Sequence, residues 1–495
     1  MATYETATTA TPGRQGAPLG LRRDAIGLRE VLFQSITDMA PGAAIAASIP
    51  AGAAFAGGSL PLSVIFALIA CLFCAFCVGE LARELPAAGS LATYAARGLH
   101  PSLGFLVAWA YALEGALIPP LVLLQLGFTV AATLHSELSV AAGLWWPWAI
   151  LGAAVVGAAG YFGIRASARL GTVLGVFEIL VFAVLGVLFV IHAGSANTGR
   201  VFTTHFTPKS YAGLTGVFAG SVYTILAFGG FEGAAPLAEE ARDPRRTVRR
   251  AVLLATLGIG ILYIFTTYAV TVAFGPAKFV GFATSGAPSW EGLARSLFGA
   301  FWFFVFLAIV NSTVANANAG VNVATRTSYA MGRVGAFPAF FATVSARHRS
   351  PLVAIAVTLV LTLGVTLGLG LGYGPTTAFA MVGAGLVILL ISTYIVVNAA
   401  CLGYFLRAKR FNLLRHGVIP ILGIVTFIPA WLTATGIHVF SFISPLTPPI
   451  SYMAYGIAGF VAAGVVYLIA LWRRDRRRVI DVGIVHLDLP TDEGG

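Results

Sequence analysis

The sequence YTILAFGGFEGAAPLAEE, residues 223–240, begins as an apolar membrane-spanning helix and then contains residues that interrupt a helix. Gly229, Gly230, Glu232 and Pro236 fall within the part that should cross the membrane. In hydrocarbon every backbone N–H and C=O must be paired inside the protein, so a helix weakened there must line a cavity or be enclosed by other helices. Backbone groups freed at mid-membrane suit a binding site. The alternative is a kinked packing helix whose glycines allow close contact.

The composition indicates a polytopic membrane protein. Of 495 residues, 58% are hydrophobic and 10% are charged, whereas soluble domains have about half and about a quarter. No cleavable signal peptide is expected, because the first thirty residues are polar and basic. We interpret the four cysteines as small core residues, because a metal site in lipid would need further ligands.

Apolar runs of the length that crosses a bilayer can be placed twelve times. They predict an all-α membrane protein with about twelve transmembrane helices and no soluble domain between them. The runs lie near 35–56, 61–81, 103–134, 146–164, 170–192, 212–238, 251–275, 297–325, 352–372, 376–404, 418–438 and 452–472. The third is long enough to be tilted or to pass beyond the bilayer surface.

The lysines and arginines predict the orientation, since cytoplasmic loops carry the excess. With the N-terminus inside, 26 of the 30 basic residues fall on inside segments. We therefore expect a multi-pass protein of the cell membrane with both termini in the cytoplasm. The lipid bilayer is its expected surrounding, and the net charge of +11 needs no nucleic-acid partner.

The first span, ITDMAPGAAIAASIPAGAAFAGG (residues 36–58), also contains a predicted break. Pro41 and Gly42 should interrupt it between Ala40 and Ala44, because proline removes a donor and clashes with the preceding turn. Two interrupted spans, five apart, are typical of an inverted-repeat transporter. We predict a tail at 1–30, a ten-helix transport core at 31–410 with repeats at about 31–192 and 211–410, two further helices at 411–475, and a tail at 476–495.

Each break should expose backbone groups of opposite polarity. A helix start offers N–H groups to an anion, and a helix end offers carbonyls to a cation, so a zwitterion fits both. The predicted anion-binding amides belong to Gly42, Ala43 and Ala44. The predicted cation-binding carbonyls belong to Met39, Ala227 and Phe228, beside Gly229 at the second break.

Four carboxylates lie in predicted spans: Asp38, Glu114, Glu178 and Glu232. Each costs about 2.5–3.5 kcal/mol on insertion scales, so each needs a reason. Asp38 precedes the first break and is interpreted as a helix-end or gate group. Glu232 lies at the second break and is a candidate substrate ligand.

Three motifs resemble the amino acid–polyamine–organocation permeases. They are GELARELPAAGSLATYAARGLHPSLGFLVAW (79–109), FGGFEGAAPLAEEARDPRRTVRRAV (228–252) and NVATRTSYAMGRVGAFPAFFATVSARHRSP (322–351). The resemblance implies a twelve-span fold with a five-plus-five inverted repeat, interrupted first and sixth helices, and a central site. It departs from the family where Ala43 and Ala44 follow Gly42 and where Arg249 replaces a proline.

The resemblance also gives roles to two carboxylates. Glu178 occupies a position where proton-coupled relatives have a lysine, so it could carry a proton or bind Na⁺ together with Ser312 and Thr313; the alternative is a structural, hydrogen-bonded carboxylate. Glu114 matches an acidic residue of putrescine-type importers. With Glu232 it would suit a substrate with two positive ends, or else the two are structural carboxylates around an amino acid.

The sequence therefore predicts a secondary active transporter that moves amino acids by alternating access, coupled to H⁺ or Na⁺, with a small-molecule substrate and no other cofactor. The alternatives are a polyamine importer, an amino acid or amine exchanger and a channel of the same fold. An integral-membrane enzyme is a remote alternative, because the eight histidines are scattered and none lies mid-span near a carboxylate. Glu239 and Glu240 are expected to pair with nearby arginines.

Overall fold

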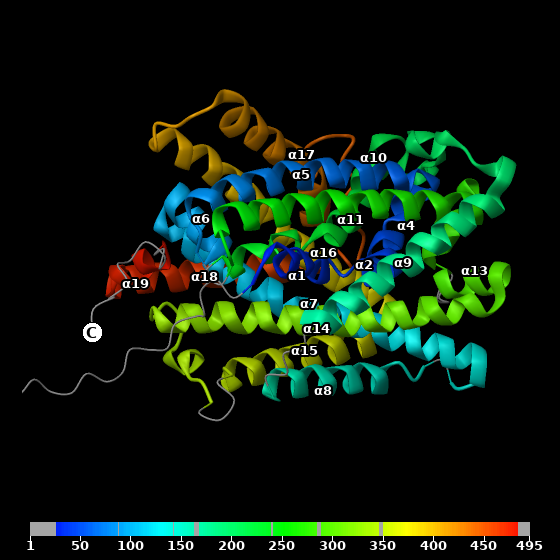
Figure 1. The fold of residues 1–495 in the computed structure, drawn as a ribbon, viewed down its shortest axis with the longest axis horizontal. Helices are drawn as coiled ribbons and strands as arrows, with labels where there is room; N and C mark the ends of the chain where they lie inside the picture. Colours follow the sequence, from blue (N-terminus) through cyan, green and yellow to red (C-terminus); the bar gives the residue numbers. More distant parts are fainter. Residues whose placement is uncertain are drawn as a thin grey trace, which may run out of the picture.

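The computed structural model describes residues 26–87, 89–141, 143–162, 168–238, 241–284, 289–345 and 350–483. These ranges form an elongated bundle of helices (Figure 1). No strand is present in them beyond an isolated bridge between Ile26 and Ala241. The predicted pairing of Glu239 and Glu240 lies outside the described residues, as do 1–25 and 484–495.

Each predicted apolar run coincides with helical structure in these ranges. The first run is divided among α1 (Leu28–Met39), α2 (Pro41–Ala43), α3 (Ile49–Ala51) and α4 (Ala53–Ala56). The others correspond to α5 (Leu60–Glu84), α7 (Pro101–Leu138), α8 (Trp146–Phe162), α9 (Ala168–Ala193), α10 (Leu214–Phe228), α11 (Pro244–Phe274), α14 (Trp302–Arg333), α15 (Leu352–Tyr373), α16 (Pro375–Arg407), α17 (Ile419–Thr435) and α18 (Tyr452–Arg474).

Ten described helical ranges are long and apolar enough to span a membrane. One of them, Leu28–Glu84, contains the first two predicted runs, and the shorter α8 falls below the length criterion. The prediction of an all-α membrane protein is confirmed. The count of twelve spans, the domain boundaries and the inverted repeat stay predictions.

The helix α7 is unusually long. Its 38 residues extend about 57 Å at 1.5 Å per residue, well beyond a hydrocarbon core of about 30 Å. It packs along α14 and α16. Glycines permit this contact: a β-carbon at Gly115 would lie 2.7 Å from Ala324 N, and one at Gly320 would lie 2.6 Å from Ile118 Cβ. The axis of the bundle is therefore built by close helix contact through small residues.

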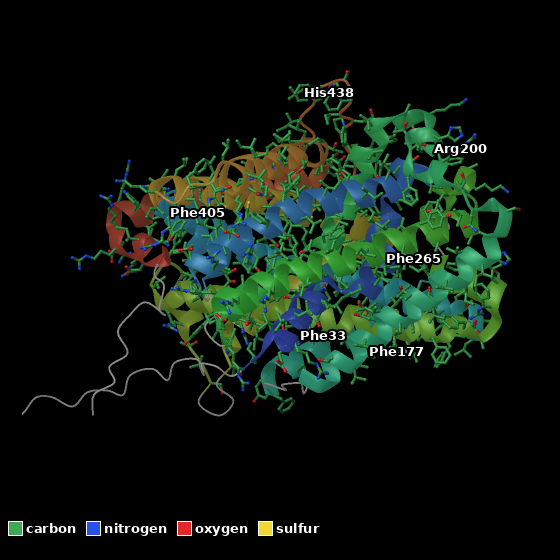
Figure 2. All side chains as sticks on the ribbon, turned by 45° about the horizontal axis from the view of Figure 1, so that its top comes forward. Phe33, Phe177, Arg200, Phe265, Phe405 and His438 are labelled. Atoms are coloured by element: carbon green, nitrogen blue, oxygen red, sulfur yellow. The ribbon has the colours of Figure 1, made fainter. Side chains whose placement is uncertain are left out.

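The helix α11 occupies the other side of the first interrupted span, where it contacts α1, α5 and α9. Aromatic side chains fill the spaces beside glycines of α9, with Phe33 of α1 against Gly175 and Phe265 of α11 against Gly186 (Figure 2). The four cysteines are free and buried, three on α5 and one on α16. They lie in the core as predicted.

Most described arginines gather at one end of the bundle, which we call the arginine-rich end. This end is formed by the last turns of α5, by α6 (Ser90–Gly98), by the first turns of α11 and by α19 (Arg476–Ile480). In Figure 1, α6 and α19 lie at one end of the bundle and α13 (Ser289–Phe298) lies at the other. At the arginine-rich end, Arg407 donates to Gly98 O, and Arg249 pairs with Glu80. Arg200 lies towards the other end (Figure 2).

Candidate substrate site at two helix breaks

The first predicted break is present. The helix α1 ends at Met39, Ala40 adopts a left-handed conformation with φ 46° and ψ 66°, and α2 begins at Pro41. Proline suits the first helical position because its missing N–H would have no partner there. Ala44 N donates to Ala40 O over 2.9 Å, so it already has an acceptor. Gly42 and Ala43 remain in the first turn, where a helix provides no acceptor of its own.

The second proline of this span does not break it. Pro50 lies in α3, directly after a π-helical turn at Ala44–Ser48. The ring of Pro50 would clash with the carbonyl of Ala46 in a regular α-helix, and the wider turn removes that clash. The chain therefore continues as a helix through Pro50.

The second predicted break is also present. The helix α10 ends at Phe228, Gly229 is extended with ψ 131°, and Gly230 has φ 108°. A positive φ of this size favours glycine. The chain then forms a 3₁₀-helix, η7 (Phe231–Leu237), rather than an α-helix. The GG pair thus supplies the conformation that ends the first half of this span.

A tyrosine of α11 joins the two breaks. The Tyr263 hydroxyl lies 3.1 Å from Met39 O and 3.0 Å from Ala227 O, and its ring contacts Phe228 edge-on at 5.2 Å. One hydroxyl can donate only one hydrogen at a time. Two carbonyls predicted to bind a cation therefore share a single protein donor, which leaves lone pairs for a ligand.

The two interrupted segments also touch directly. A β-carbon at Gly230 would lie 2.5 Å from Asp38 C, and one at Gly233 would overlap Asp38 Oδ2. Ser35 Oγ donates to Phe231 O at 2.8 Å and accepts from Ala234 N at 3.1 Å. The last turn of α1 is thus bound to the start of η7, and the glycines provide the space.

Three carboxyl groups converge beside the breaks. Glu232 interacts electrostatically with both Glu114 and Asp38. Glu232 Oε2 accepts from Tyr394 Oη at 2.7 Å and from Gly230 N at 3.2 Å. Glu114 Oε2 has no hydrogen-bond partner in the described part of the chain. All three carboxyl groups are at least 92% buried, since their exposed fractions are 8% or less.

The negative groups at this position outnumber the positive ones. Asp38 also interacts with Arg326 and accepts from Gln34 Nε2 at 3.0 Å. Among the described residues, no lysine, arginine or histidine is within ion-pair distance of Glu114 or Glu232. Burying an ionised carboxylate without a partner is costly, so this arrangement is suited to a cationic ligand.

The second candidate cluster lies at Gly42. A β-carbon there would be 3.0 Å from Glu178 Oε2, 3.0 Å from Ser312 Cβ and 3.1 Å from Ala308 O. Glu178 interacts with the side chains of Ser312 and Asn311. Glu178 Oε2 and Ser312 Oγ are nevertheless buried without a hydrogen bond of good geometry in the described residues. Oxygen atoms of α9 and α14 thus lie beside Gly42 at the first break.

Thr313, which was predicted to share the ion-coupling role, is turned to its own helix. Its Oγ1 donates to Val310 O at 2.9 Å, which is the usual local bond of a helical threonine. Its oxygen can still accept a hydrogen bond, but among the described contacts of Glu178 there is none with Thr313. Ser312 and Asn311 are the α14 residues that face Glu178.

Four residues that support the breaks were not predicted from the sequence: Ser35, Gln125, Tyr263 and Tyr394. Gln125 Nε2 donates to Ala43 O at 2.9 Å. The two tyrosines had a usable signal, because a tyrosine buried mid-span needs a partner for its hydroxyl. The sequence contains no such signal for Ser35 and Gln125, because their roles depend on which helices pack against α1 and α7.

The sequence profile of the amino acid permease family matches residues 30–480. The chain belongs to the amino acid permease family. This match covers every helix from α2 to α18 and includes both breaks. The resemblance drawn from the three motifs is confirmed.

Individual relatives cover less of the chain. The low-affinity putrescine importer PlaP of Escherichia coli K12 is 30% identical over 304 residues, which are 60% of this chain and 65% of PlaP. The branched-chain amino acid permease BcaP of Bacillus subtilis is 25% identical over 319 residues, 61% of this chain and 66% of BcaP. The chain thus matches slightly less than two thirds of the length of either relative. Amino acid transporter 1 of Schizosaccharomyces pombe is 27% identical over 412 residues, 79% of this chain and 68% of that protein.

Proposed function

We propose that this permease is a secondary active transporter that moves amine-bearing solutes across the cell membrane by alternating access, with both termini in the cytoplasm. Membership of a permease family supports transport over the membrane-enzyme alternative. The basic residues support the orientation, because they gather at one end of the bundle. No nucleic-acid role is proposed.

The substrate class is inferred from the buried group of Asp38, Glu114 and Glu232. Among the described residues, no basic side chain is within ion-pair distance of Glu114 or Glu232, and Asp38 interacts with Arg326. An ammonium group would pair with these carboxylates and with the carbonyls beside Tyr263. A diamine has two such groups and no negative end, so it fits three carboxylates better than a zwitterion does. We therefore favour a polyamine of the putrescine type, which is what the relative PlaP is named for.

An amino acid is the second candidate, and the first break supports it. The amides of Gly42 and Ala43 lie at a helix start, where a substrate carboxylate is favoured. Met39, Ala227, Phe228 and Gly229 would then surround the amino group. Under this proposal Glu114 is structural, and the relative BcaP, named a branched-chain amino acid permease, is the nearer guide.

Uptake into proteoliposomes distinguishes the two candidates. Labelled putrescine is compared with a panel of labelled amino acids in wild type, Glu114→Gln and the control Glu84→Gln. Glu84 ends α5 and lies 3.7 Å from Arg410 at the surface. A lost hydrogen bond to a charged group costs about 1.5–3 kcal/mol, so putrescine uptake by Glu114→Gln should fall roughly 10- to 100-fold at low substrate, while Glu84→Gln behaves as wild type.

Uptake of a neutral amino acid that survives Glu114→Gln, without putrescine uptake, would refute the polyamine proposal. Absence of uptake for every solute, under either gradient, would refute the transport proposal. Comparing vesicles with and without internal substrate tests exchange as an alternative to symport.

We further propose that Glu178 and Ser312 bind the coupling ion, which is H⁺ or Na⁺. A carboxylate, a hydroxyl and a backbone carbonyl are ligands that suit Na⁺, and the carboxylate alone can carry a proton. Glu178→Gln should abolish the response of uptake to an imposed ion gradient while leaving substrate binding measurable. An unchanged gradient response in Glu178→Gln would remove Glu178 from the coupling site.

A further inference from the structure

A cluster of arginines lies apart from the candidate substrate site, at the arginine-rich end. It is a surface pocket of about 490 Å³ between the end of α5 and the start of α11. Five arginines and one leucine line it: Arg83, Arg245, Arg246, Arg249, Arg250 and Leu253. An excess of arginine at one side is expected of a membrane protein, but their convergence on one pocket is not.

The carboxylates near the pocket engage only some of these arginines. Arg249 Nη2 binds Glu80 Oε1 at 2.9 Å, and Arg246 Nε lies 3.8 Å from Asp243 Oδ2. Arg83, Arg245 and Arg250 have no carboxylate within ion-pair distance in the part of the chain that the structure describes. Counted over the described residues, the pocket therefore carries an excess of positive charge, and the N-terminus of α11 adds to it.

The pocket continues into an apolar strip on the outside of α11. Arg250, Leu254, Leu257 and Ile261 follow the spacing i, i+4, i+7 and i+11, which places them on one helix face. The three apolar side chains are 51%, 44% and 58% exposed. Eleven residues rise about 16 Å, which is about half of a 30 Å hydrocarbon core.

We propose that this pocket binds the phosphate of an acidic phospholipid whose acyl chain lies along Leu254, Leu257 and Ile261. Guanidinium groups bind phosphate oxygens through paired N–H donors. The strip begins directly below Arg250 and has the length of one bilayer leaflet. A soluble phosphate compound would use the arginines but not the strip, so the geometry favours the lipid.

The test uses the full-length protein purified in a neutral detergent. Native mass spectrometry measures the binding of phosphatidylglycerol, with phosphatidylcholine and inorganic phosphate as the comparison ligands. The pocket variant is Arg245→Gln/Arg246→Gln/Arg250→Gln, which leaves the Arg249–Glu80 ion pair in place. The control Arg473→Gln/Arg474→Gln/Arg477→Gln removes three exposed arginines of the same end.

Each arginine near an anionic lipid is worth about a fivefold factor in binding, so the pocket variant should bind phosphatidylglycerol roughly a hundredfold more weakly. The control variant should bind it as wild type does. Equal weakening in both variants, or equal binding of phosphatidylcholine by wild type, would overturn the proposal. Inorganic phosphate that displaces phosphatidylglycerol at similar concentration would make the pocket a soluble-anion site instead.

A third variant, Leu254→Ser/Leu257→Ser, tests the apolar strip. Unchanged lipid binding by this variant would contradict the placement of the acyl chain.

Discussion

Replacing Tyr263 with phenylalanine removes the hydroxyl that joins the two helix breaks and leaves the ring in place. The ring keeps its contact with Phe228, so the packing change is small. What is lost is the donor that Met39 O and Ala227 O share at 3.1 and 3.0 Å. The substitution thus tests whether that donor stabilises the interrupted segments.

The size of the effect follows from the burial of the three groups, which are at most 2% exposed. A buried hydrogen bond contributes about 1 kcal/mol net, and a buried acceptor left without a donor costs about 1–3 kcal/mol. We expect Tyr263→Phe to lower the free energy of unfolding by about 1–3 kcal/mol. Substrate uptake should also fall, because the two breaks lose their common donor.

The matched control is Tyr268→Phe on the same helix, whose hydroxyl lies 3.1 Å from Asn197 Oδ1 in a half-buried position. Water can replace that bond, so the control should lose less stability. Apparent melting temperatures in one detergent, and initial uptake rates in proteoliposomes, provide the comparison. Equal melting temperatures for Tyr263→Phe and wild type, or equal losses in the two variants, would refute the reasoning.

Two further substitutions test the same region. Gly230→Ala should prevent correct folding, seen as loss of monodisperse protein in size-exclusion chromatography, because its φ of 108° disfavours a side chain and its methyl group would lie 2.5 Å from the backbone carbon of Asp38. Gly258→Ala, with nothing within 4 Å, should express as wild type. A well-folded Gly230→Ala protein would show that the two segments do not pack as closely as described. Tyr394→Phe removes the 2.7 Å bond to Glu232 Oε2 and should weaken substrate binding about tenfold, near 1.4 kcal/mol, in a scintillation proximity assay; unchanged affinity would show that Glu232 is not oriented by Tyr394.

The breaks were predictable because their causes are local. Pro41 cannot donate, and Gly230 tolerates a positive φ, so both interruptions follow from a few adjacent residues. The choice of available amides was less predictable: Ala44 lies beside Gly42 and Ala43 in the sequence, yet its N–H donates to Ala40 O. That bond depends on how the helix restarts, which composition does not determine.

The partners of the candidate site were less accessible to sequence reasoning. Tyr263 lies 36 residues after Ala227 and 224 after Met39, and its role depends on α11 packing between the two breaks. Glu178 and Ser312 could be paired in advance only through the resemblance to a family. The proximity of Asn311 to Glu178 became apparent only from the structure, because it depends on how α9 packs against α14.

The contact between the last turn of α1 and η7 has a consequence for how the protein can move. Ser35 is bonded to both Phe231 O and Ala234 N, and Gly230 and Gly233 approach Asp38 closely, so sliding of one segment past the other would break these contacts. The last turn of α1 and the start of η7 should therefore move together. A ligand that displaces either break should therefore displace both, so that two segments far apart in the chain respond to the same binding event.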